Sequence, residues 1–354
     1  MNTTFNPGPS KVYPEIPAYV QEAYAQGILS INHRSEAFMT LCRETLEVFK
    51  DRLSIPESYQ VVFTSSATEC WEIIAQSLTK SMSYHFYNGA FGEKWFHFAK
   101  QIRSRAKAAP FGTDKLPAFD TMKVPRAAEI LCFTQNETSN GTRIPQMALE
   151  SVHRKFPKAL IAVDATSSLG GIALDFSRID IGYASVQKCL GLPAGLGIMI
   201  LSPRAVDRAR QLNEKDHYNS LTRILDNMQK HQTHYTPNVL AIYLLRRTME
   251  QRYTIEPIHK RLEEQYKELS QCITQSSVLD WLVPEDYMRS RTVLAVKAPA
   301  DRIAHIHKEA AEAGIILGKG YGDLKETTFR IANFPAIDSE DIAKLKTFLT
   351  NNYS

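Results

Sequence analysis

Lys188 is the residue whose surroundings most suggest chemistry, because its neighbours in "ASVQKCLGLPAG" (184–195) are mostly small or apolar. A lysine in a water-poor site has a lowered pKa, and its neutral amine can form a Schiff base with an aldehyde. The alternative is an ordinary charge at the edge of a loop. Groups elsewhere in the chain that would hold an aldehyde-bearing ligand decide between the two interpretations.

Asp164 is a second candidate, because it directly follows apolar residues in "LIAVDA" (160–165). An unpaired carboxylate is costly to bury, so Asp164 is expected to meet a cation or a protonated nitrogen. Taken alone, the residue fits an Asx turn or a helix N-cap better. Whether Asp164 has a functional role therefore depends on which other candidate residues lie near it.

The turn "SSAT" (65–68) lies between a predicted strand and a predicted helix. Backbone N–H groups and hydroxyls at the start of a helix suit an anion such as phosphate, although Ser and Thr are equally common as plain N-caps. The turn has neither the glycine spacing nor the lysine of a P-loop, and no GxGxxG follows a strand. These absences disfavour ATPases and nicotinamide enzymes.

Two further places carry residues that bind ligands in many proteins. Phe91 stands in "NGAFGEK" (88–94), where it either stacks on a planar ligand or belongs to the core. His33 and Arg34 in "INHRS" (31–35) suit a carboxylate or a phosphate, or form a solvated loop pair.

The elements that must position these residues follow an α/β pattern, in which short apolar runs alternate with helical spacing. Strands are predicted at 59–66, 128–138, 159–168, 181–188 and 195–203; residues 204–275 are mostly helical, and a small α+β unit follows. We expect an N-terminal segment near the active site (1–15), a large domain (16–252) and a small C-terminal α+β domain (253–354). Ligands of such sheets bind at the carboxyl ends of the strands, where the candidates fall.

Composition excludes several classes of function. The 354 residues carry 42 Lys and Arg against 38 Asp and Glu, a net charge of +4, which is too mild for a nucleic-acid or membrane partner. Five cysteines at no metal-like or framework spacing predict reduced thiols, no disulfide and no metal site. No apolar run is long enough to span a membrane. We therefore expect a cytoplasmic protein that acts on small molecules.

The candidates together meet the needs of pyridoxal phosphate, which has an aldehyde, a ring, a ring nitrogen and a phosphate. The chain also resembles the class V aminotransferases of the type I pyridoxal-phosphate fold, and among them the phosphoserine aminotransferases. The resemblance covers nearly the whole chain, in order, through the segments "FNPGPS", "INHRS", "QNETSNG", "VDATSS", "SVQK", "YTPNVLAIYLL" and "FRIANF".

The resemblance implies a large domain with a mostly parallel seven-stranded sheet, a small α+β domain and a homodimer with shared active sites. It makes Lys188 the Schiff-base lysine and proton shuttle, and Asp164 the partner of the ring nitrogen. The remaining roles that it implies are ring stacking by Phe91, a hydrogen bond to the phenolic oxygen by Thr138, phosphate binding by Ser66, Ala67, Thr68, Gln187 and Thr236 of the partner subunit, and substrate binding by Arg330, His33 and Arg34.

The expected reaction is ping-pong transamination between phosphoserine and 2-oxoglutarate, a step of serine biosynthesis. The chain departs from the family's pattern where Glu69 stands near an expected arginine, and where "GKGYGDLKETTFR" (318–330) offers Lys319 and Tyr321 in place of a His-Arg pair. An aminotransferase that uses alanine or serine with glyoxylate is therefore an alternative. A non-enzymatic binding or regulatory module is another, but it predicts the loss of Lys188 or Asp164, and both are present.

Overall fold

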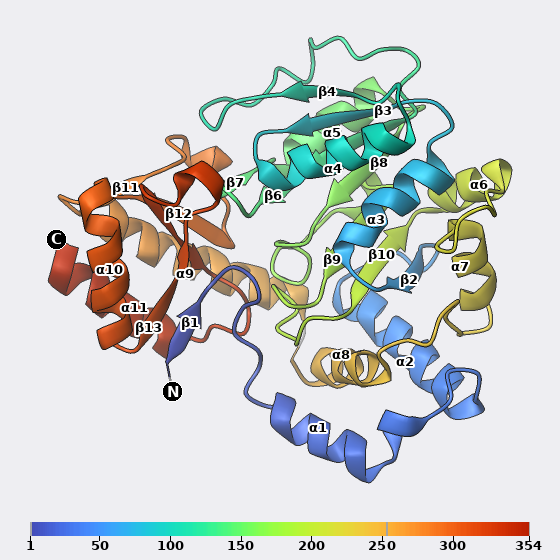
Figure 1. The fold of residues 1–354 in the computed structure, drawn as a ribbon, viewed down its shortest axis with the longest axis horizontal. Helices are drawn as coiled ribbons and strands as arrows, with labels where there is room; N and C mark the ends of the chain where they lie inside the picture. The colour runs from blue at the N-terminus through green and yellow to red at the C-terminus, as the bar shows by residue number, and fades with distance from the viewer. Residues whose placement is uncertain (1, 253, 354) are drawn as a thin grey trace.

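The computed structural model describes residues 2–252 and 254–353, which form two separate β-sheets with helices around them (Figure 1). Two apolar cores accompany the sheets. The predicted boundary at Tyr253 falls between α8 (Val239–Arg252) and α9 (Ile255–Thr274). It stays a prediction, because Tyr253 lies outside the described residues, as do Met1 and Ser354 at the ends of the predicted domains.

The larger sheet has seven strands in the order β2-β10-β9-β8-β5-β3-β4. Only β10 runs antiparallel to its neighbours, so the predicted mostly parallel seven-stranded sheet is confirmed. Every residue of the four strands β5, β8, β9 and β10 is buried, as expected for strands covered on both faces. The strands are β2 (Gln60–Thr64), β3 (Ser83–Tyr87), β4 (Lys107–Pro110), β5 (Ile130–Thr134), β8 (Leu160–Asp164), β9 (Ile181–Ser185) and β10 (Gly197–Leu201).

Helices that start just after strands of this sheet pack back onto it. The helix α3 contacts β2, β9 and β10, whereas α4 contacts β3, β4 and β5. The helices α1 and α2 pack on α8 in a further layer, at the bottom of Figure 1. The helices of this part are α1 (Ile16–Ala25), α2 (Glu36–Arg52), α3 (Ala67–Ile73) with a π-helical turn η2 (Ile74–Leu78), α4 (Ala90–Ile102), α5 (Gln146–Lys155), α6 (Pro203–Leu212) and α7 (Leu221–Met228), with the 3₁₀ turns η1 (Ile28–Ser30) and η3 (Phe176–Arg178).

The smaller sheet joins the two ends of the chain. Its order is β1-β13-β14-β12-β11, and β1 (Thr3–Phe5) runs parallel to β13. The sequence predicts β12, β13 and β14 and the two helices of this part, but neither β1 nor β11. The other elements are β11 (Asp280–Trp281), β12 (Val293–Lys297), β13 (Ile315–Lys319), β14 (Thr328–Ala332), α10 (Ala300–Glu312), α11 (Ser339–Tyr353), η4 (Asp286–Met288) and η5 (Gly322–Leu324).

The two sheets face each other across the edge where the functional candidates gather. Thr134, Asp164 and Ser185 are the last residues of β5, β8 and β9, whose carboxyl ends meet because these strands are parallel. A small hairpin, β6 (Asn136–Glu137) with β7 (Thr142–Arg143), extends the same edge. Within the described residues, no helix is both long and apolar enough to cross a membrane.

The burial of β1 predicts that the N-terminal segment stabilises the smaller sheet. Phe5 is 0% exposed, so Phe5→Ala should lower the free energy of unfolding by about 3–5 kcal/mol through lost burial and a cavity. Urea unfolding followed by circular dichroism measures this change. Tyr24→Ala, at a side chain that is 76% exposed, is the control and should cost less than about 0.5 kcal/mol. Equal effects of the two substitutions would contradict the assignment of Phe5 to the core.

Candidate active site

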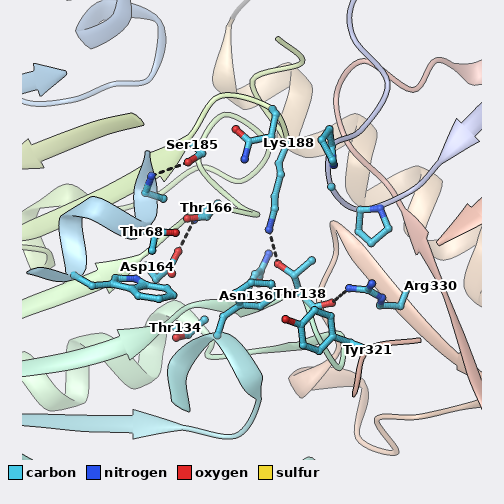
Figure 2. A pocket seen from close by; sticks show the side chains of 17 residues that line it. Thr68, Thr134, Asn136, Thr138, Asp164, Thr166, Ser185, Lys188, Tyr321 and Arg330 are labelled. Atoms are coloured by element: carbon cyan, nitrogen blue, oxygen red, sulfur yellow. Dashed lines mark hydrogen bonds between the residues drawn. The ribbon is translucent and has the colours of Figure 1, made fainter. Parts of the chain in front are cut away.

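A pocket lies at the carboxyl edge of the larger sheet, with walls from both sheets and the N-terminal segment (Figure 2). Its lining includes most of the residues that the sequence singles out, together with several that it does not. The lining residues are Pro7, Gly8, Pro9, Ala67, Thr68, Trp71, Phe91, Thr134, Asn136, Thr138, Asp164, Thr166, Ser185, Gln187, Lys188, Tyr321 and Arg330.

Lys188 enters the pocket from the loop that follows β9. Only 8% of the residue is exposed, and its Nζ donates to Oγ1 of Thr138 at 2.8 Å. The Nζ also lies 5.2 Å from the centre of the Phe91 ring. Burial lowers the pKa of Lys188, and the charges of Asp164 and Glu137 oppose that shift. The amine is therefore more easily deprotonated than a surface lysine, as a nucleophile requires.

Asp164 is buried at the end of β8 and faces the same pocket. Its Oδ1 accepts from the backbone N–H of Thr166 at 2.9 Å. Burial raises the pKa of Asp164, while the hydrogen bonds from Thr166 and the charge of Lys188 oppose the rise. The Asx-type bond to Thr166 and the orientation into the pocket occur together. A positively charged ligand group beside Asp164 would favour its ionised form.

The turn before α3 both caps the helix and lines the pocket. Ser66 Oγ accepts from the N–H of Glu69 at 3.2 Å, and the Glu69 carboxylate accepts from Ser65 N–H at 2.7 Å. Ala67 N–H donates to Oγ of Ser185 at 2.7 Å. Among the turn residues, Ala67 and Thr68 line the pocket, and Ser66 and Glu69 do not. The N-cap interpretation is thus confirmed for Ser66, and the phosphate-binding role of the turn stays a prediction.

Phe91 is held at the pocket by a buried carboxylate that sequence reasoning missed. Glu137 Oε2 accepts from the N–H groups of Phe91 and Gly92, each at 3.1 Å, at the start of α4. Its Oε1 accepts from Ser139 N–H at 3.0 Å and Ser139 Oγ at 2.6 Å. Burial raises the pKa of Glu137, and these bonds oppose the rise. The signal in the sequence is a glutamate three residues after the end of a strand that begins with four apolar residues.

Arg330 reaches the pocket from the middle of β14. Its Nε donates to the carbonyl of Lys319 at 2.8 Å, and its Nη1 donates to the carbonyl of Thr138 at 2.7 Å. Nη2 makes no hydrogen bond to the described residues. Burial lowers the pKa of this guanidinium. Two anchored N–H groups fix the plane of the side chain, so its free edge is oriented for an anionic ligand.

Several polar atoms of the lining have no partner within the described part of the chain. Oγ1 of Thr134, Oγ1 of Thr166 and Oδ1 of Asn136 are buried and make no hydrogen bond. Native proteins rarely leave buried polar atoms unpaired, so these atoms indicate a polar ligand or water in the pocket. Trp71, also unforeseen, lines the pocket from α3; its place in an apolar helical repeat made it resemble a core residue.

Four predicted residues lie outside the pocket of the single chain. These are His33, Arg34, Ser66 and Thr236. Arg34 Nη1 donates to Oδ1 of Asn227 at 3.0 Å and to Oε1 of Gln232 at 2.7 Å. Their roles stay predictions. In residues 2–252 and 254–353, no three His, Cys, Asp or Glu side chains are grouped as a metal site.

Comparisons with known proteins agree on one family. A family model described as "Aminotransferase class-V" matches residues 3–323. A crystal structure of a phosphoserine aminotransferase from Cytophaga hutchinsonii superposes with a TM-score of 0.94 at 34% identity, over 99% of each chain. A phosphoserine aminotransferase from Rhodococcus opacus is 28% identical over 96% of this chain and 92% of its own length.

A structure of alanine–glyoxylate aminotransferase from Nostoc sp. superposes with a TM-score of 0.82 at 20% identity, over 99% of this chain and 94% of its own. At this identity the likeness shows the fold alone. The family model and the superposition on the Cytophaga hutchinsonii structure confirm both the predicted fold class and the predicted family.

Because the charge of Asp164 raises the pKa of Lys188, we expect Asp164→Asn to lower that pKa further. The substitution removes a negative charge that favours the ammonium, so the pKa of Lys188 in the cofactor-free protein should fall further, by about one pH unit or more. Competitive labelling with acetic anhydride across pH, resolved by mass spectrometry, measures this pKa. The reactivity of Lys308, whose side chain is 74% exposed, should not change. An unchanged or raised pKa of Lys188 would refute the coupling.

Proposed function

The chain belongs to the class V aminotransferase family, and on this premise we propose that it is a phosphoserine aminotransferase that transfers the amino group to 2-oxoglutarate. The activity is that of a pyridoxal-phosphate-dependent transaminase. The observation that carries the proposal is that a desolvated lysine, a buried carboxylate and an anchored arginine face one pocket. The relatives named phosphoserine aminotransferase support the choice of substrate, which would place the protein in serine biosynthesis.

The residues of the pocket fit pyridoxal phosphate. Lys188 offers an amine for the aldehyde, Asp164 a carboxylate for the protonated ring nitrogen, and Thr138 a hydroxyl for the phenolic oxygen. Phe91 offers a ring face. We assign the phosphate to Ser66, Ala67, Thr68 and Gln187, with Thr236 of the partner subunit. The unpartnered hydroxyls of the lining also match a cofactor that carries many oxygens.

When bound, the cofactor supplies an electron sink that stabilises negative charge at the substrate's Cα. The chain's own residues do the rest. With the cofactor held in the pocket, Lys188 Nζ would accept the Cα proton, and its lowered pKa favours the neutral amine that this role needs. Asp164 would keep the ring nitrogen protonated. Thr138 orients Lys188 through the 2.8 Å hydrogen bond from Nζ.

Substrate binding is assigned to Arg330, His33 and Arg34. The free edge of the Arg330 guanidinium would take the α-carboxylate. His33 and Arg34 would lie near the side-chain acid group, as the family resemblance implies. Because neither lines the pocket of its own chain, they would contribute through a second copy in a homodimer, as would Thr236. The shared active site and the homodimer are thus part of the same proposal.

A second candidate is an aminotransferase that uses alanine or serine with glyoxylate. The serine-rich turn before α3 favours it, as does the lack of a His-Arg pair ahead of Arg330. It requires no subsite for a second acid group. Substrate tests separate the two candidates.

Lys188→Ala should abolish the visible absorbance band that the purified protein acquires with pyridoxal phosphate, because the variant has no amine to attach the aldehyde. An absorbance spectrum after removal of free cofactor measures the band. Lys308→Ala, at an exposed lysine of α10, should keep it. A band that survives in Lys188→Ala, or one that the unaltered protein never shows, would exclude the assigned role.

Phosphoserine and glutamate should each convert the cofactor band of the holoenzyme in a half-reaction, since a ping-pong transaminase must accept both amino donors. Stopped-flow spectra with phosphoserine, glutamate, serine and alanine measure the rates. Phosphoserine should react faster than serine or alanine. If glutamate reacts and phosphoserine does not, or if alanine and serine react fastest, the second candidate replaces the first.

A further inference from the structure

Tyr321, which lines the pocket, is hydrogen-bonded to Lys94, an exposed lysine just outside the lining. Tyr321 precedes η5 in the smaller sheet's part of the chain and lines the pocket, whereas Lys94 lies on α4. Lys94 Nζ donates to the Tyr321 hydroxyl at 2.7 Å. The Tyr321 ring lies 5.3 Å from the Phe91 ring and 5.6 Å from the guanidinium carbon of Arg330. Figure 2 shows Tyr321 beside Thr138 and Arg330.

Lys94 is a cation without a carboxylate partner among the described residues. Its Nζ lies 5.8 Å from the Phe91 ring centre, and Lys188 Nζ lies 5.2 Å from the same point. The hydrogen bond to Tyr321 leaves two ammonium N–H groups and the phenolic O–H as donors. A cluster of donors with an unneutralised charge, beside the pocket residue Tyr321, suits an anion.

Lys319, two residues before Tyr321, points away from the pocket. In the pairing of β13 with β14, Gly318 is opposite Arg330, and Lys319 is opposite Phe329. Successive residues of a strand alternate between faces, so Lys319 and Phe329 share the face away from Arg330. Phe329 lies 6.5 Å from the ring of His307 in α10, on that face. Burial and the charge of Lys319 lower the pKa of His307, which agrees with this placement.

We propose that Lys94 and Tyr321 contribute to the subsite for the second acid group of the substrate, together with the partner subunit's His33 and Arg34, while Arg330 takes the α-carboxylate. This inference rests on the proposed function and specifies its substrate class: amino acids and 2-oxo acids with an anionic side chain. The phosphate of phosphoserine and the distal carboxylate of glutamate and 2-oxoglutarate share that chemistry. The pair would supply positive charge where the family's pattern has a His-Arg pair and this chain has none.

The test compares Lys94→Met with Lys94→Arg and with Lys319→Met as the matched control. Loss of one charged hydrogen-bond donor predicts that Lys94→Met raises the apparent Kd of phosphoserine and of glutamate about tenfold more than that of serine. Half-reactions of the holoenzyme measure these constants. Lys94→Arg should restore most of the affinity, and Lys319→Met should match the unaltered protein. Tyr321→Phe should show a smaller loss in the same direction, because the ammonium remains.

A binding measurement without turnover completes the test. Titration calorimetry of the holoenzyme with glutarate, a dicarboxylate that has no amino group, should show a Kd about tenfold higher in Lys94→Met and unchanged in Lys319→Met. Equal affinities in Lys94→Met and the unaltered protein, or an equal loss in Lys319→Met, would overturn the subsite.

The two proposals fail in different ways. If phosphoserine is not a substrate but glutamate is, the phosphoserine assignment falls and glutamate still tests the subsite. If neither acidic amino acid reacts, both proposals fall.

Discussion

The active-site structure depends on burying an amine and a carboxylate, Lys188 and Asp164, in one pocket. Burial alone lowers the pKa of Lys188 and raises that of Asp164, and the charge of each opposes the shift of the other. The parallel strands make this possible, because β8 ends in Asp164 and β9 leads directly to Lys188. Such perturbed pairs are costly for stability and are typical of functional sites.

Thr138 connects Lys188, which follows the larger sheet's strand β9, with Arg330 of the smaller sheet. Its hydroxyl accepts from Lys188 at 2.8 Å, and its carbonyl accepts from Arg330 at 2.7 Å. The N-terminal segment adds a third wall: β1 pairs with β13, and a Cβ on Gly8 would lie 3.2 Å from Cε of Lys188. The lysine is thus buried by segments from both ends of the chain, and the close approach leaves little room for a side chain at Gly8.

Sequence patterns predicted the strands and site residues that follow from the local order of residues. They did not predict those that depend on contacts between distant parts of the chain. Lys188, Asp164 and Arg330 line the pocket as expected, because each follows from an apolar strand pattern or from the family resemblance. The strands β1, β3, β4 and β11 were among those missed. β1 has only three residues and pairs with the far end of the chain, β4 is a half-exposed edge strand, and β11 has only two residues. Glu137 was missed because its carboxylate accepts hydrogen bonds from the start of α4, which is distant in sequence. Trp71 was missed because only tertiary packing places it in the pocket lining.

We propose that Lys188 is the lysine to which the cofactor attaches. Borohydride reduction of the holoenzyme, followed by tryptic digestion and mass spectrometry, tests it most directly, because reduction makes the attachment permanent. We expect the mass of the reduced cofactor on the peptide that contains Lys188, at near-full occupancy. Attachment spread over exposed lysines, or found at any other single lysine, would contradict it.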